Sequence, residues 1–170
     1  MAAIKKNQAD QTGQLSFPIM ISVDAMGSDD GPASIVAGCA ISAKKNSRLG
    51  FILHGPTELL QQLVKRRKEL VGRCEIRHAS DIVSMEDKPS QAVRTGTDTS
   101  MWSAIESVRT GEASVAVSCG NTGALMPMSM IRLRKLPGVK RPAIAVLWPS
   151  LNPQGFNVLL DVGADIRADA

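Results

Sequence analysis

The chain has 170 residues, of which 44% are hydrophobic and 21% are charged, a composition typical of a globular protein. Its formal net charge of +4 falls short of the dense basic stripe of a nucleic-acid-binding domain, and no stretch approaches the ~18 consecutive apolar residues of a membrane span. Three widely spaced cysteines without a C-x-x-C pair exclude a disulfide framework and a structural zinc site. We expect one domain, or one lobe of a larger protein, in the reducing cytoplasm, with no nucleic-acid partner.

Predicted strands and helices alternate along the chain after a polar leader. Residues 1–16 contain no apolar run, so they are predicted to be a disordered leader and not a signal peptide. The predicted strands are 17–24, 49–55, 74–80, 114–118, 141–149 and 156–163. The predicted helices begin at Pro32, span 56–70 and 100–111, and begin again after Gly123. This alternation predicts the α/β class, with a mostly parallel sheet and helices on both of its faces.

A long polar stretch, residues 81–100, interrupts the alternation and is predicted to be a functional or mobile insertion. Lys88 and Arg94 lie within it. Cations on such a loop can reach over a site and clamp a phosphate group, although the local sequence alone favours a solvated loop.

Polar, glycine-containing loops follow several predicted strands, at the end of the sheet where α/β proteins bind ligands. The clearest is Ser118–Gly123, which leads from a strand into a helix. Its backbone N–H groups and the helix dipole can hold an anion, and Asn121 and Thr122 can cap the helix or donate to a ligand. A capped turn without a ligand fits these residues equally well. Pro127 predicts that a helix capped by Gly123 has a bent or open first turn.

The loop after the first strand contains Asp24, Asp29 and Asp30. Three close carboxylates can bind Mg²⁺, but acidic residues on a surface loop are commoner, and we expect Asp24 to orient neighbouring donors. The glycines at positions 27 and 31 do not form G-x-G-x-x-G, so no dinucleotide fingerprint is present.

The remaining reactive side chains are predicted to be structural. His54 and His78 lie at strand ends and are expected to be satisfied structural histidines, and Cys39 is expected in the core. The basic run 65–68 is predicted to be a solvated helix face with, as the alternative, a weak attraction to anionic lipid. Cys119 poses a choice between a reactive thiol and a small residue in an anion-binding loop.

Five stretches, in this order and spacing, resemble the bacterial phosphate acyltransferases of phospholipid synthesis over about residues 17–170. They are DAMGSDDGP (24–32), MEDKPSQAVR (85–94), SCGNTGALM (118–126), LPGVKRPAIA (136–145) and LLDVGAD (159–165). The resemblance implies an enzyme that converts an acyl carrier protein thioester and inorganic phosphate into acyl phosphate. It also implies the three-layer αβα sandwich shared with phosphotransacetylases and the isocitrate and isopropylmalate dehydrogenases.

The resemblance further implies a homodimer with no metal or nucleotide cofactor, loosely attached to the membrane surface. Because family members are longer, the chain is expected to be the N-terminal portion of a longer protein and to be inactive alone. The alternatives are a phosphotransacetylase-like enzyme and a truncated lobe that binds a ligand without turnover.

The matched motifs also imply site residues. The expected catalytic residues are Lys88, Asn121 and Thr122, and the expected substrate-binding residues are Asp24, Gly27, Arg94, Ser118, Gly120, Gly123 and Asp161. The chain departs from the family pattern at Cys119, where a small residue such as alanine is usual, and at Asp165, where asparagine is common.

Overall fold

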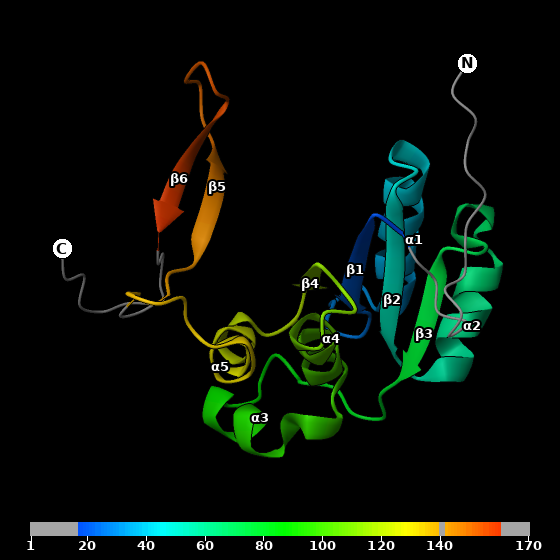
Figure 1. The fold of residues 1–170 in the computed structure, drawn as a ribbon, viewed down its shortest axis with the longest axis horizontal. Coiled ribbons are helices and arrows are strands. Elements are labelled where there is room, and N and C mark those ends of the chain that lie inside the picture. The colour runs from blue at the N-terminus through cyan, green and yellow to red at the C-terminus, as the bar shows by residue number, and fades with distance from the viewer. Residues whose placement is uncertain (1–16, 140–141, 161–170) are drawn as a thin grey trace. The chain divides into compact units, whose positions relative to one another are not determined.

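The computed structural model describes residues 17–139 and 142–160 (Figure 1). The predicted leader, Asp161 and Asp165 lie outside these residues. The chain divides at Leu133 into two compact units, which are described separately below. That residues 17–170 form a single domain stays a prediction. Within the described ranges, no helix combines the length and apolar character that crossing a bilayer requires.

The first unit is built on a four-stranded sheet with the order β3-β2-β1-β4, in which every neighbouring pair is parallel. Its strands are β1 (Ile19–Asp24), β2 (Leu49–Gly55), β3 (Cys74–His78) and β4 (Val115–Ser118). These confirm four of the predicted strands to within two residues at each end. The strands alternate with helices, so the predicted α/β class is confirmed.

Helices cover both faces of this sheet (Figure 1). The α-helices are α1 (Pro32–Lys45), α2 (Thr57–Lys65), α3 (Pro89–Thr95), α4 (Ser100–Arg109) and α5 (Thr122–Leu133), with 3₁₀ turns η1 (Lys68–Leu70) and η2 (Gly96–Asp98). Val23, Phe51 and Leu53 of the strands form a core with α1 and α2. Because side chains alternate along a strand, Ser22 and His54 point to the opposite face, where α4 packs. The likeness to the dehydrogenase fold stays a prediction.

His54 links the sheet to α4 through a buried polar cluster. Its Nε2 lies 2.8 Å from the Ser22 hydroxyl and its Nδ1 lies 2.7 Å from the Ser103 hydroxyl. Since Ser22 donates its proton to the Ala104 carbonyl at 2.8 Å, Nε2 must be the protonated nitrogen and Nδ1 the acceptor. Burial, aided by the charge of Arg77, lowers the pKa of His54 to about 3. The prediction of a structural histidine is confirmed here.

The polar stretch 81–100 contains helical elements that sequence reasoning did not predict, and its role as a functional or mobile insertion stays a prediction. Pro89 occupies the first turn of α3, where its missing N–H costs nothing, and Ala92 is buried in a core with Met101 and Met128. Thr99 then caps α4, as the Trp102 N–H donates to its hydroxyl at 3.2 Å. A few apolar residues in a polar sequence were therefore enough to fold this segment against α4 and α5.

The second unit contains β5 (Ala145–Pro149) and β6 (Phe156–Leu160), which form an antiparallel two-stranded sheet of their own. Both strands were predicted, but the alternation with helices that predicts a parallel sheet fails here. Residues 150–155 are too few for the crossover that parallel strands need, and they form a hairpin connection instead.

Candidate functional site

The site begins where β1 and β4 end side by side. Asp24 and Ser118 are paired across the two strands, and the Ser118 hydroxyl donates a 2.7 Å hydrogen bond to Oδ2 of Asp24. The Asp24 carboxylate is 1% exposed, and its Oδ1 accepts the Met26 N–H at 3.2 Å. The Gly120 N–H in turn donates to Ser118 Oγ at 3.1 Å. Asp24 and Ser118 therefore orient the backbone of both loops, the role expected of Asp24.

Two glycines allow these loops to touch through their backbones. A Cβ atom on Gly27 would lie 2.7 Å from Asp24 Oδ2 and 2.8 Å from the Gly120 nitrogen. A Cβ atom on Gly120 would lie 3.0 Å from the Gly27 Cα. A side chain at position 27 would push the loops apart, so the contact requires glycine there. The structure thus brings together Asp24, Gly27, Ser118 and Gly120, as the sequence predicted.

Asn121 caps α5 and ties a third segment to it. Its Oδ1 accepts the Ala124 N–H at 3.1 Å, which is the bond of a helix N-cap. Its Nδ2 donates to the carbonyl oxygens of Ser84 at 2.9 Å, Met85 at 3.3 Å and Asp87 at 3.1 Å. The Asn121 amide is thus occupied by backbone partners, and its predicted contact with phosphate stays a prediction. With Asn121 as the cap, α5 starts at Thr122, whereas we expected it to start after Gly123. Pro127 lies in the interior of this helix.

The first backbone amides of α5 face no partner in the part of the chain that the structure describes. No hydrogen bond of the N–H groups of Asn121, Thr122 or Gly123 is recorded within residues 17–139 and 142–160. The Thr122 side chain is exposed at the same place. Unpaired amides at the start of a 12-residue helix bind anions, because the N–H groups and the helix dipole both favour negative charge. We identify this turn as the candidate anion site.

The bonds of Asn121 bring Lys88 to this turn. Lys88 follows Asp87 directly, and Pro89 Cγ lies 3.1 Å from the position of a Cβ atom on Gly123. The Lys88 side chain is exposed, and no ion pair of it is found within the described ranges. Arg94 is also exposed but lies in the last turn of α3, about 9 Å further along the helix axis, and no hydrogen bond among the described residues joins it to the turn.

The carboxylates of the first loop do not share a site. Asp29 and Asp30 are exposed, whereas Asp24 is buried and bonded to Ser118. Among the described residues, no group of three His, Cys, Asp or Glu side chains is placed to hold a metal ion. Asp161 cannot be placed because it lies outside the described residues.

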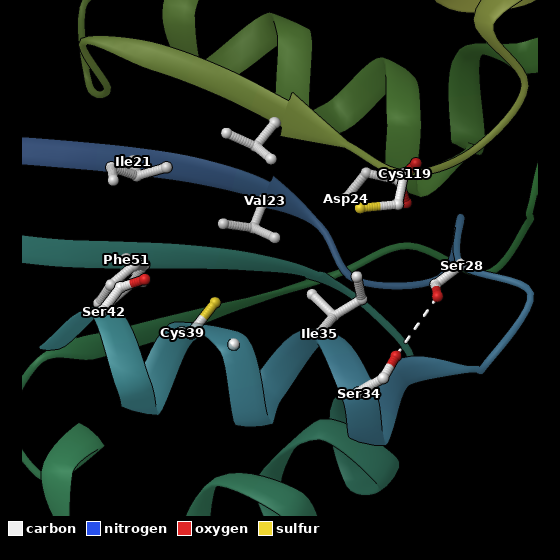
Figure 2. A pocket seen from close by; sticks show the side chains of 12 residues that line it. Ile21, Val23, Asp24, Ser28, Ser34, Ile35, Cys39, Ser42, Phe51 and Cys119 are labelled. Atoms are coloured by element: carbon white, nitrogen blue, oxygen red, sulfur yellow. Dashed lines mark hydrogen bonds between the residues drawn. The ribbon is translucent and has the colours of Figure 1, made fainter. Parts of the chain in front are cut away.

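Sequence reasoning missed an apolar groove that ends at this site (Figure 2). It opens between α1 and the sheet face at β1 and β4, with Asp24 and Cys119 at the carboxyl end of the strands. Two signals were present in the sequence: small residues at every fourth position of α1 (Ser34, Gly38, Ser42) and a valine facing them from β4, Val117. They mark a groove only once the sheet order is known.

Comparisons with known proteins agree with the motifs of the sequence. The model of a family described as "Fatty acid synthesis protein" matches residues 19–170. A phosphate acyltransferase of Roseobacter denitrificans is 68% identical over 163 residues, which are 96% of this chain and 46% of the relative. One of Ruegeria sp. is 72% identical over 151 residues, 89% of this chain and 40% of the relative. One of Cereibacter sphaeroides is 64% identical over 170 residues, 100% of this chain and 45% of the relative.

The resemblance inferred from the five stretches is therefore confirmed. The chain spans less than half of the length of these curated relatives, between 40% and 46%.

Proposed function

The chain belongs to the family of fatty acid synthesis proteins, and on that premise we propose that it takes part in a phosphate acyltransferase reaction. The proposed enzyme transfers a fatty acyl group from acyl carrier protein to inorganic phosphate, and the acyl phosphate is used in phospholipid synthesis. The single observation that supports the phosphate site is the set of unpaired backbone amides of Asn121, Thr122 and Gly123. The hydrogen bond between Ser118 and Asp24 positions the loop that leads to these amides. The name of the relatives supports the acyl transfer.

The reaction makes one bond and breaks another without a covalent enzyme intermediate. A phosphate oxygen attacks the thioester carbonyl carbon, a tetrahedral oxyanion forms, and the C–S bond then breaks to release the thiolate, which takes up a proton. Fixing phosphate next to the thioester lowers the entropic barrier to attack. Backbone amides aimed at the anion stabilise it without reorganisation, and one such donor typically contributes about 10²–10³ in rate.

The residues have separate roles in this proposal. The amides at the start of α5 hold phosphate or the oxyanion, with Thr122 and Asn121 beside them, and Lys88 supplies the compensating positive charge. Ser118 and Asp24 position the loop and do not contact the phosphate. The proposal requires no metal or nucleotide cofactor, and it includes the homodimer and the loose membrane attachment that the family resemblance implies.

The test uses the intact protein that carries these 170 residues, with acyl carrier protein loaded with a long acyl chain. Incubation with inorganic phosphate is expected to release the free carrier protein thiol, and hydroxylamine is expected to trap the acyl phosphate as a hydroxamate. Omission of phosphate should abolish both products. Thiol release without phosphate would indicate simple hydrolysis and would contradict the proposal. Activity restricted to short acyl donors would favour the phosphotransacetylase-like alternative.

A further inference from the structure

The groove beside α1 has a volume of about 430 Å³, within the usual range of small-molecule sites. Figure 2 shows its side chains: Val23 and Ile21 of β1 line the sheet side, and Ile35 and Cys39 of α1 line the helix side. Val117 of β4, which lies across from Val23 in the sheet, is 43% exposed. The groove is therefore an apolar surface that follows the strand direction along its whole length.

The groove stays open because α1 presents small residues to it. Ser34, Gly38 and Ser42 recur at every fourth position and lie on one side of the helix. A Cβ atom on Gly38 would meet no atom within 4 Å, so this position faces empty space. The Ser34 hydroxyl donates to the Gly31 carbonyl at 2.7 Å and lies 3.3 Å from that of Ser28. These hydroxyls are satisfied and place no demand on a ligand.

One end of the groove reaches the loop that leads to the candidate anion site. Cys119 and Asp24 line the groove, and Cys119 lies between Ser118 and Gly120 in the loop that leads to the free amides of α5. The buried Asp24 carboxylate is the only charged group in the lining, and it is bonded to Ser118 and Met26. An apolar groove that ends beside the loop leading to these amides matches a molecule with a linear alkyl tail and a phosphate or thioester head.

We propose that this groove is the acyl-chain subsite, which places the alkyl tail along α1 and the carbonyl carbon at Cys119 and Gly120. The inference rests on the proposed function for the head group, but the tail site is argued from the groove alone. Burial of each methylene is expected to raise affinity about fourfold, so the affinity should rise with chain length. A helix from another segment, or a second copy of the chain, is the competing occupant.

The probe is a series of octyl, decyl and dodecyl phosphate, with inorganic phosphate as the reference. Binding to the chain is measured by calorimetry and by protection of Cys119 from iodoacetamide, read by mass spectrometry. Cys119 suits this purpose because it is exposed, whereas Cys39 is buried and Cys74 is half-buried. We expect tighter binding with each longer tail and slower alkylation of Cys119. Equal affinity across the series would overturn the subsite.

The decisive variants add bulk at Gly38. Gly38→Leu is expected to weaken dodecyl phosphate binding by about tenfold or more, and to leave the affinity for inorganic phosphate unchanged. Gly38→Ala should have a smaller effect. Ala33→Leu places the same leucine side chain at an exposed position of α1 outside the groove and should bind like the wild type. Cooperative thermal unfolding of each of the three variants checks that it is folded.

The same variants separate failure of the subsite from failure of the proposed function. In the intact enzyme, Gly38→Leu should shift the preference from long to short acyl donors. If the wild type forms acyl phosphate and Gly38→Leu keeps the wild-type chain-length profile, the subsite is wrong and the function stands. If Cys119 is unreactive and alkyl phosphates do not bind, a protein segment covers the groove and the subsite is wrong. If alkyl phosphates bind in the groove but no acyl phosphate forms, the function is wrong.

Discussion

Ser118 donates a 2.7 Å hydrogen bond to Oδ2 of Asp24, a carboxylate that is 1% exposed. Removing the hydroxyl leaves a buried charge with one fewer donor and also removes the acceptor of the Gly120 N–H. Ser118→Ala is therefore expected to lower the free energy of unfolding by about 1–3 kcal/mol, as measured by urea denaturation. Ser114→Ala, at an exposed serine before β4, is the control and should change it by less than about 0.5 kcal/mol. Equal effects of the two variants would contradict a special role of the bond.

Gly27 and Gly38 form a matched pair for the test of the loop contact. A Cβ atom on Gly27 would lie 2.8 Å from the Gly120 nitrogen, which is backbone and cannot turn aside, whereas one on Gly38 would meet nothing within 4 Å. Gly27→Ala should lower the melting temperature and weaken phosphate binding, because it separates the two loops. Gly38→Ala should raise stability by up to about 1 kcal/mol, since alanine favours the helix. Normal phosphate binding by Gly27→Ala would show that the contact does not shape the site.

Lys88→Ala in the intact enzyme should raise the phosphate concentration needed for half-maximal rate without loss of stability. A hydrogen bond to a charged group contributes about 1.5–3 kcal/mol, which corresponds to at least a tenfold change. Lys68→Ala removes an exposed lysine from η1 and serves as the control. An unchanged phosphate requirement in Lys88→Ala would remove this residue from the site.

The stability of the first unit should depend on pH through His54. Its folded-state pKa of about 3 lies below the ordinary value of 6.5, so the unfolded chain binds the proton more tightly. Stability is therefore complete above about pH 6.5 and falls as pH decreases towards the folded-state value, by about 1.4 kcal/mol per pH unit for one proton. Denaturation between about pH 6.5 and 4.5 avoids most carboxylate titration.

Replacement of the two histidines distinguishes the source of this pH dependence. His54→Gln should remove the slope, at a lower overall stability, because a buried group without charge replaces the titrating one. His78→Gln should keep the slope, since His78 is exposed and its ring lies 3.3 Å from the Thr57 hydroxyl, without the buried polar cluster that surrounds His54. The same slope in both variants would assign the dependence to other groups.

The fold of the first unit could be predicted because its signals are local. Apolar runs predicted β1 and β2, and Pro32 predicted the start of α1. The structure confirms these three elements. The length of the connection between β5 and β6 is also a local signal. It is too short for the crossover between parallel strands and favours an antiparallel hairpin. Helix α3 was missed because its stability comes from Ala92 packing against residues distant in sequence.

The site was predictable only as a set of loops at strand ends. The pairing of Asp24 with Ser118 follows from parallel strands, but the sheet order that makes β1 and β4 neighbours is not encoded in either loop. The three carbonyls that bind Asn121 carry no side-chain signal at all, since any residue supplies a carbonyl. Sequence reasoning left Asn121 as a helix cap or a ligand donor; its side chain caps α5 and bonds to backbone carbonyls, and its contact with phosphate stays a prediction.

Cys119 should be a small residue at the site and not a nucleophile. A catalytic cysteine needs a base that accepts its proton. His54 is 0% exposed and held by Ser22 and Ser103, and His78 ends β3, on the opposite edge of the sheet from β4. These are the only two histidines of the chain, so no imidazole of this chain is placed to activate the thiol.

Cys119→Ala in the intact enzyme should therefore keep most of the acyl phosphate formation, within a few-fold of the wild type. Phosphate is itself the nucleophile in the proposed reaction, and the amides of the turn belong to the backbone, so the substitution removes neither. The measurement combines the rate of hydroxamate formation with mass spectrometry of the wild-type enzyme after a single turnover. A loss of several orders of magnitude, together with an acyl thioester trapped on Cys119, would reverse this conclusion and make the loop before the candidate anion site a nucleophile site.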